Sequence, residues 1–269
     1  MRSAVAGTSL IAALGLLACG VRTPPSHDQT PVQVTRVEVA TVEARAYESA
    51  ERAPCAEGMV LVDGEHCSEV DQRCVRWLDP PGRYEHFRCA EYAQPSVCRG
   101  TRSALRYCID VDEAHHAGES LPESHVTFKA AERACAERGA RLCTEREFEL
   151  ACEGPELRPY PYGFARAAGA CNVDRADLGR PGHGLHDLRT ATGANDACVS
   201  SYGVRDLVGN VEEWARRDEA VALQTHTKQT LLMGSWWMPG RSTCRGVNGG
   251  HEATYEGPET GYRCCANPR

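Results

Sequence analysis

The sequence predicts an α+β domain with little regular secondary structure, held together by disulfide bonds. Only two segments carry the periodicity and capping signals of helices, and the apolar runs elsewhere are short. The chain also has 15 cysteines, a density that is typical of oxidising compartments and rare in the cytosol. Residues 55–269 are long enough to form one domain with its own core.

The N-terminus has the features of a lipoprotein signal peptide. Arg2 supplies a positive charge, and a short apolar stretch then ends in Leu-Leu-Ala-Cys, which resembles a bacterial lipobox. In this interpretation residues 1–18 are the signal peptide, Cys19 carries a lipid that binds the membrane, and residues 19–54 form a tether. An ordinary signal peptide with an incidental cysteine is the alternative. Because Gly20 rather than Asp follows, the resemblance favours an exported outer-membrane lipoprotein of the cell envelope.

The cysteine count agrees with this interpretation. Setting Cys19 aside from the 15 cysteines leaves 14, which is enough for seven disulfides, each contributing roughly 2–5 kcal/mol. The chain has no C-x2-C pair, and its one adjacent pair is Cys264-Cys265, so a zinc protein is disfavoured. The connectivity stays open at this stage.

The charge of the chain bears on its partners. The net charge is −7 and no Lys/Arg cluster is present. Nucleic-acid binding therefore has no electrostatic support.

Two helices are predicted from their ends. Thr127 can cap the first helix, and Gly139 stands where a glycine commonly ends one. Thr144 and Glu147 form a capping box at the start of the second helix, which we expect to stop at Gly154.

The remaining elements are predicted to be short. Residues 58–62 are an apolar run before Asp63-Gly64, a turn signal, so we expect a strand leading into a hairpin. Further expected features are strands at 106–111, 231–233 and 262–265, a disulfide-stapled loop region over 67–100, and a mostly irregular segment over 155–205.

Four blocks, in order, resemble the formylglycine-generating enzyme (sulfatase-modifying factor) family. They are GMVLV at 58–62, GARLCTEREFELA at 139–151, YGVRDLVGNVEEW at 202–214, and GSW at 234–236 followed by CR at 244–245 and GYRC at 261–264. The resemblance covers about residues 55–266. It implies the irregular fold of that family, which is similar to the C-type-lectin-like superfamily.

The resemblance marks one candidate catalytic residue. Family members with oxidase activity convert a cysteine of a substrate protein to formylglycine with copper held by two nearby cysteines, and soft thiolates suit Cu(I). Here only Cys244 falls in that segment, and Met238 or Pro239 occupies the first position. The sequence thus lacks the paired catalytic cysteines, and copper is expected only if the protein is an active oxidase. The alternative is a structural disulfide of Cys244, with Cys264 or Cys265 as possible partners.

The resemblance also implies calcium, held by hard oxygen ligands. The alternative is a turn packed under Trp214 without a metal. The implied ligands are the carboxylates of Asp206 and Glu213 and the carbonyls of Gly209 and Val211 at one site, and oxygens of Asn172 and Val173 at a second.

Another branch of the family, the ergothioneine-type sulfoxide synthases, has a His-rich iron site. The nearest candidates are His115, His116, His183 and His186, which lack a carboxylate at facial-triad spacing. We expect them to be surface histidines.

Aromatic residues suggest a cleft, although core packing is expected for at least one of the two tryptophans. The residues are Tyr162, Trp236 and Trp237. The leading hypothesis for function is a divergent, non-catalytic family member that binds a peptide, protein or glycan. The alternatives are a copper- and O2-dependent formylglycine-generating oxidase and a purely structural envelope protein.

Overall fold

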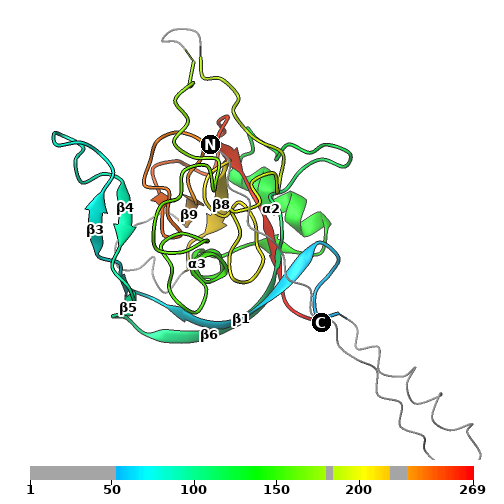
Figure 1. Ribbon diagram of the computed structural model, residues 1–269. Coiled ribbons are helices and arrows are strands. Elements are labelled where there is room, and N and C mark those ends of the chain that lie inside the picture. The colour runs from blue at the N-terminus through cyan, green and yellow to red at the C-terminus, as the bar shows by residue number, and fades with distance from the viewer. Residues whose placement is uncertain (1–52, 180–183, 219–228) are drawn as a thin grey trace, which may run out of the picture. The chain divides into compact units, whose positions relative to one another are not determined.

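The computed structural model describes residues 53–179, 184–218 and 229–269 (Figure 1). The predicted signal peptide, Cys19 and nearly all of the predicted tether therefore lie outside the described residues. Residues 51–269 are one compact unit. No helix of the described part is long and apolar enough to cross a membrane.

Two small sheets form the framework. In the first sheet the strand order is β1-β6-β12-β7, and in the second it is β10-β9-β8-β11. Every strand pair in these sheets is antiparallel except β8 with β11. The strands are β1 (Met59–Cys67), β6 (Arg102–Asp110), β7 (Arg141–Leu142), β8 (Glu212–Arg216), β9 (Thr230–Met233), β10 (Val247–Asn248), β11 (Thr260–Gly261) and β12 (Cys264–Ala266).

The segment between β1 and β6 forms an extension that we call the arm, residues 70–98. Figure 1 shows it standing beside the body of the domain. It contains two pairs of short strands, and the disulfides Cys67–Cys98 and Cys74–Cys89 staple it. The expected disulfide-stapled region is confirmed, although it is not purely loop. The pairs are β2 (Val70–Asp71) with β5 (Val97–Cys98), and β3 (Cys74–Trp77) with β4 (Cys89–Tyr92).

Both predicted helices are confirmed. Helix α2 (Phe128–Glu137) is capped by Thr127, whose side chain accepts from the Ala130 amide. Helix α3 (Glu145–Glu153) has the predicted capping box and ends at Gly154, which adopts a φ of 63°.

The predicted turn at Asp63-Gly64 is wrong. Strand β1 runs through both residues, and Gly64 lies opposite Leu105 of β6. A Cβ on this glycine would come within 2.5 Å of the Tyr202 hydroxyl. The glycine therefore permits a close approach of another segment, which a local turn signal cannot reveal.

All 14 cysteines after Cys19 form the seven disulfides that their number allows. Cys244 is bridged to Cys152, so the suggestion of Cys264 or Cys265 as its partner is wrong. The adjacent cysteines at the C-terminus instead pair with residues near the two helices. The remaining bridges are Cys55–Cys108, Cys135–Cys264, Cys143–Cys265, Cys152–Cys244 and Cys171–Cys198.

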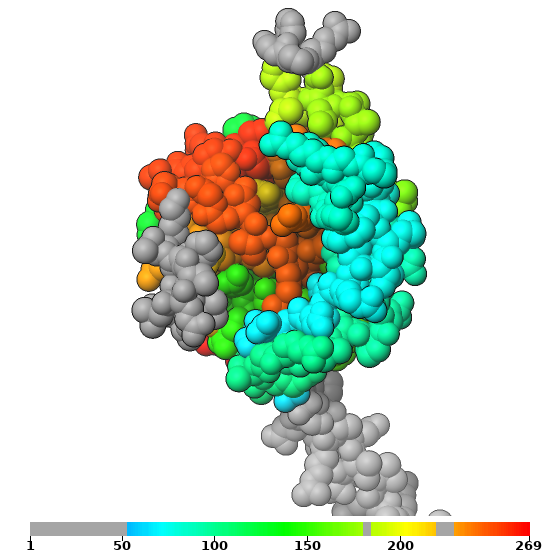
Figure 2. Space-filling model, turned by 90° about the vertical axis from the view of Figure 1, so that its left-hand side faces the viewer, coloured from blue at the N-terminus to red at the C-terminus, as the bar shows by residue number. Residues whose placement is uncertain are grey.

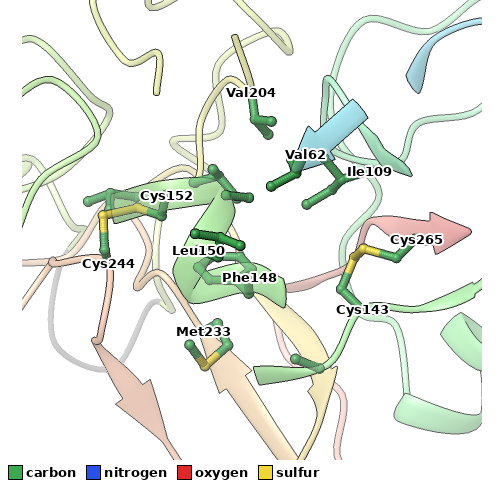
Figure 3. Packing of buried hydrophobic residues seen from close by; sticks show 14 of the residues in the cluster. Val62, Ile109, Cys143, Phe148, Leu150, Cys152, Val204, Met233, Cys244 and Cys265 are labelled. Carbon is green, nitrogen blue, oxygen red and sulfur yellow. A yellow bond between two sulfur atoms is a disulfide. The ribbon is translucent and has the colours of Figure 1, made fainter. Parts of the chain in front are cut away.

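Helix α3 fills the main core. Phe148 and Leu150 point from α3 toward Val62 of β1, Ile109 of β6 and Met233 of β9, all fully or almost fully buried (Figure 3). The helix thus packs against both sheets at once. The predicted α+β architecture with little regular secondary structure, held together by disulfides, is confirmed.

The capping box gives a direct test of this packing. We predict that Thr144→Ala lowers the free energy of unfolding by about 1 kcal/mol, because the Glu147 amide loses its acceptor. Thr144→Ser keeps the hydroxyl and is the matched control. Urea unfolding measures both variants, and equal stability of the two would contradict the assignment.

Candidate functional site

The predicted calcium residues come from two loops in direct contact, at 172–173 and 206–211, and, for Glu213, from strand β8. The loop at 206–210 has left-handed backbone at Asp206, Gly209 and Asn210, with φ values of 53°, 90° and 60°. A Cβ on Gly209 would come within 2.6 Å of the Asn172 carbonyl oxygen and within 2.6 Å of the Val173 side chain. The structure thus brings the candidate residues of both predicted sites together.

Asn210, which no prediction singled out, joins the two loops. It is fully buried, its amide donates to the Asn172 carbonyl at 3.0 Å, and its Nδ2 donates to Glu113 at 2.6 Å. Its Oδ1 accepts from the Asn172 side chain at 3.0 Å and from the Thr190 amide at 2.8 Å. Both ends of the Asn210 side-chain amide are therefore engaged in hydrogen bonds that hold the two loops together. The sequence Gly209-Asn210-Val211 alone does not show this role.

The two candidate carboxylates have different partners. Asp206 accepts from the Gly193 amide at 2.9 Å and from Asn195 Nδ2 at 3.2 Å. Both Glu213 oxygens accept from Arg263, at 2.6 Å from Nε and 2.6 Å from Nη2. The Glu213 carboxylate therefore already holds a cationic side chain.

Negative charge is in excess around this ion pair. Burial is the main cause that raises the pKa of Asp206, Glu213 and Glu113. Repulsion by Asp206 further raises the pKa of both Glu113 and Glu213, and Arg263 opposes the shift in all three. A divalent cation would relieve such an excess.

The donor set fits calcium in part. The carboxylate of Asp206 and the neutral carbonyl oxygens of Gly209 and Val211 are hard donors that suit the ion, whereas Glu213 is turned to Arg263. Asn172 uses its carbonyl and side-chain oxygens for Asn210 and Arg175. The part of the chain that the structure describes contains no group of three or more His, Cys, Asp or Glu side chains placed to hold a metal.

Among the residues that the structure describes, the candidate donors for copper and iron do not form a site. Cys244 is fully buried in its disulfide with Cys152, so the assignment of Cys244 as a catalytic thiolate is corrected for this disulfide form. His115 and His116 are exposed, and His186 is exposed and lies against the Asp177 carbonyl. His183 lies outside the described residues.

A groove lies between the arm and the segment 235–248. It consists of two neighbouring pockets of about 470 Å³ and about 160 Å³ that share Arg241, Gly246 and Val247. Figure 2 shows the hollow, with the arm along one side. We call both pockets together the arm groove. The larger is lined by Gln72, Cys74, Trp77, His86, Phe87, Cys89, Tyr92, Arg166, Thr243 and Arg245 in addition, and the smaller by Glu212, Ser235, Trp236, Met238, Pro239 and Gly240.

One of the three predicted cleft residues lines this groove. Trp236 lines the smaller pocket, whereas Trp237 is fully buried and packs edge-on against Trp236 at 4.8 Å. Tyr162 stacks on Tyr160 at 5.5 Å and lines neither pocket. The expectation that at least one tryptophan belongs to the core is thus met by Trp237.

The arm forms one wall of the groove, and no sequence pattern predicted this. Trp77 and Phe87 come from the Cys-, Pro- and Arg-rich segment that was predicted only as a stapled loop. Both aromatic residues lie in a segment without the hydrophobic periodicity of a helix or strand, so the sequence gives them no evident place in a core. Aromatic residues of this kind in loops are candidates for ligand binding, and this was the signal that could have identified the wall.

Glu212 is a buried carboxyl group at the groove. Burial is the main cause that raises its pKa to about 7, and Glu259 adds to the shift while the Asn248 side chain opposes it. Asn248 Nδ2 donates to Glu212 at 3.1 Å. This carboxyl group is thus neutral or charged depending on pH near neutrality.

Together these features define a disulfide-rich α+β domain with an open groove and, in this disulfide form, no thiolate pair beside it. The chain belongs to the family of sulfatase-modifying factor enzyme 1-like domains, whose model matches residues 29–268.

Known proteins agree with this assignment. The chain is 29% identical over 231 residues to the hercynine oxygenase of Mycolicibacterium smegmatis, which covers 79% of this chain and 46% of that protein. It is 33% identical over 127 residues to the inactive C-alpha-formylglycine-generating enzyme 2 of Bos taurus, which covers 44% of this chain and 39% of that protein. The chain thus spans less than half the length of these relatives.

A solved structure supports the fold. PvdO from Pseudomonas aeruginosa has a TM-score of 0.51 and 14% identity, over 81% of this chain and 100% of that one. At this identity the likeness shows the fold alone.

The Cys152–Cys244 disulfide can be tested directly. We predict that peptide mapping of the non-reduced protein finds the Cys244 peptide linked to the Cys152 peptide, because the two residues are bridged and buried. Alkylation of Cys244 without prior reduction would contradict the assignment.

Glu212 generates a pH prediction. Since the folded state holds its proton more tightly than the unfolded state, its contribution to stability is largest below about 4.5 and is lost as pH rises through about 7. We therefore predict that the melting temperature of Glu212→Gln, relative to the unmodified protein, increases from pH 4.5 to pH 7. Exposed Glu57→Gln is the control, and a difference that does not change with pH would contradict the prediction.

Proposed function

We propose that this domain is a non-catalytic binding module of an exported lipoprotein, and that its arm groove takes a peptide or a glycan. The observation that carries the proposal is the disulfide at Cys244. Its neighbours Thr243 and Arg245 line the larger pocket, while Cys244 itself is buried and bridged to Cys152. A ligand can thus enter the groove, but no thiolate meets it there.

The groove has the composition of a binding site. Ligand sites combine apolar and aromatic walls with a few placed polar groups. Trp77 and Phe87 provide aromatic surface, and Arg241 provides a charged group over the Phe87 ring at 5.4 Å. The formylglycine-generating oxidase remains the alternative, and it requires a reduced, accessible Cys244.

A relative supports the same view. One of the matched proteins carries the name of an inactive enzyme, in Bos taurus, and is 33% identical over 127 residues. We extend the loss of oxidase activity to this chain as part of the proposal.

The proposal includes the location of the protein. The lipobox-like sequence at Cys19 supports a lipid anchor, with residues 19–54 as the tether to the outer membrane. Seven disulfides support export, because such bridges persist in oxidising compartments.

Calcium is part of the proposal as a structural ion. Asp206, Gly209 and Val211 would hold it, and Glu213 would have to share its carboxylate with Arg263. The ion would offset the buried negative charge and fix the loop at 206–210, without taking part in ligand chemistry.

The functional test combines activity and binding. We predict that the non-reduced protein, given copper, O2 and a cysteine-containing peptide, yields no formylglycine by mass spectrometry. The same protein should bind members of an immobilised peptide library or a glycan array, and Trp77→Ala should weaken that binding by about tenfold or more, the loss expected of an aromatic anchor. Leu185→Ala, an exposed site that lines neither pocket, is the control. Formylglycine product, or binding that Trp77→Ala leaves unchanged, would contradict the proposal.

Calcium binding has its own test. We predict that Ca²⁺ raises the melting temperature of the chelator-treated protein, because an ion that binds only the folded state stabilises it by mass action. Asp206→Asn should remove the increase, since it removes a charged ligand but keeps an oxygen for Gly193. Mg²⁺ is the control ion, and an unchanged melting temperature at saturating Ca²⁺ would refute the calcium site.

A further inference from the structure

The larger pocket of the arm groove is lined by cationic side chains, whereas the smaller pocket is lined by one carboxyl group, that of the buried Glu212. The chain has a net charge of −7, yet the larger pocket is lined by the three arginines Arg166, Arg241 and Arg245 and by no carboxylate of the described residues. Like a positive patch at other interfaces, such a pocket selects negatively charged partners.

Only one of the three arginines is available for a ligand. Arg166 lies 2.7 Å from Asp174, and Arg245 lies 2.5 Å from Glu153 and 3.1 Å from Glu149. Arg241 is exposed and makes no ion pair with a carboxylate in the described part of the chain; its guanidinium instead lies 5.4 Å from the centre of the Phe87 ring. Ring stacking of this kind limits the motion of the guanidinium and leaves its edge open to a carboxylate.

Next to Arg241 lies a place for an apolar group. Arg241 lines both pockets, and the smaller one presents Trp236, Met238 and Pro239 in a volume of about 160 Å³. A cavity of about 150 Å³ holds a benzene ring. The smaller pocket thus has room for one apolar side chain beside the charge.

The arm favours a polypeptide over a glycan. Four of the eight exposed large apolar side chains among the described residues are on the arm between Cys74 and Cys89; one of them, Trp77, lines the larger pocket together with Val247, and the other three lie on the arm outside the pocket. Aliphatic side chains add contact area for another polypeptide, whereas sugar recognition depends on polar groups and flat rings. The four are Val75, Trp77, Leu78 and Tyr84, with exposed fractions of 48%, 40%, 43% and 59%.

We infer that the arm groove binds an acidic polypeptide segment in which a carboxylate residue stands beside an apolar residue. The carboxylate pairs with Arg241, and the apolar side chain enters the pocket of Trp236 and Met238, while the flanking residues lie along the arm. This inference rests on the proposed binding function and names its ligand class.

The test uses two pools of short labelled peptides and one anionic glycan. The first pool combines Asp or Glu with Leu, Met or Phe, and the second has Asn or Gln in place of the acids. Fluorescence anisotropy with the full non-reduced protein should show about tenfold tighter binding of the acidic pool, falling with salt. Arg241→Gln should remove that preference, Arg241→Lys should keep part of it, and Arg83→Gln, an exposed arm residue, should keep all of it.

The outcomes separate the two levels of the proposal. Equal binding of both pools, or retention of the acidic preference in Arg241→Gln, would overturn the acidic-peptide inference but keep a binding groove. Tighter binding of polygalacturonate than of the acidic pool, lost in Arg241→Gln, would also overturn it and assign the groove to anionic glycans. No binding of any probe would count against both the inference and the proposed function. Unchanged melting temperatures of the variants show that folding is not the cause.

Discussion

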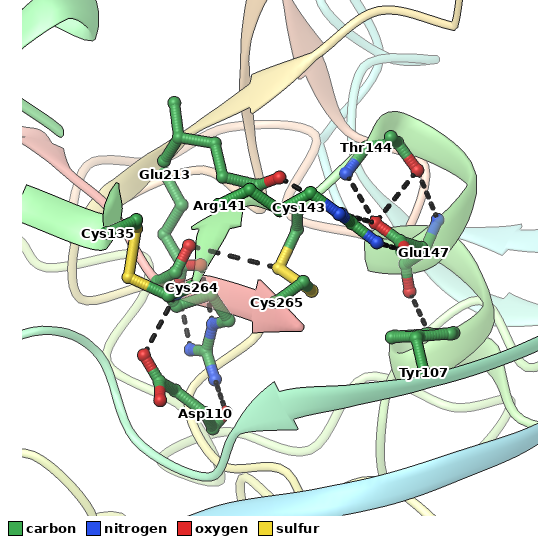
Figure 4. Close-up of a disulfide and its surroundings, with 12 residues drawn as sticks. Tyr107, Asp110, Cys135, Arg141, Cys143, Thr144, Glu147, Glu213, Cys264 and Cys265 are labelled. Carbon is green, nitrogen blue, oxygen red and sulfur yellow. Dashed lines mark hydrogen bonds and ion pairs between the residues drawn. A yellow bond between two sulfur atoms is a disulfide. The ribbon is translucent and has the colours of Figure 1, made fainter. Parts of the chain in front are cut away.

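The C-terminal segment is the constraint on which the rest of the domain depends. Strand β11 belongs to the second sheet and β12 to the first, so residues 260–266 join the two. Between these strands Arg263 is fully buried against Glu213 of β8. Cys264 and Cys265 of β12 bridge to Cys135 and Cys143 (Figure 4). Removing one partner of a buried ion pair typically costs about 3–5 kcal/mol. The segment thus ties the sheets and helices together by one buried ion pair and two disulfides.

The groove depends on this junction. Two strands of the second sheet position residues that line the smaller pocket of the groove. Glu212 is the first residue of β8, and Ser235 follows shortly after the end of β9. Helix α3 connects the same region to the core, since its Cys152 is bridged to Cys244 below the larger pocket. The bridge that removes a thiolate from the groove therefore also fixes the loop that carries Arg241. Both sulfurs of this bridge are therefore used for structure.

The sequence was informative wherever the signal was local. Thr127, Thr144 and Gly154 mark the helix ends correctly because caps satisfy backbone groups within a few residues. Asp63-Gly64 misled because the glycine is required by contact with distant Tyr202, and Trp236 and Trp237 could not be told apart because burial depends on the whole fold. Disulfide number followed from composition, but pairing such as Cys152–Cys244 depends on which distant segments meet.

The central claim, that the arm groove is the binding site, can be tested with the four tryptophans of the chain. Trp77 and Trp236 line the groove, whereas Trp214 and Trp237 are buried. In an NMR titration of the indole-labelled protein with the acidic peptide pool, we expect the Trp77 and Trp236 signals to shift while those of Trp214 and Trp237 change little. Shifts confined to the two buried indoles, or none at saturating peptide, would contradict it.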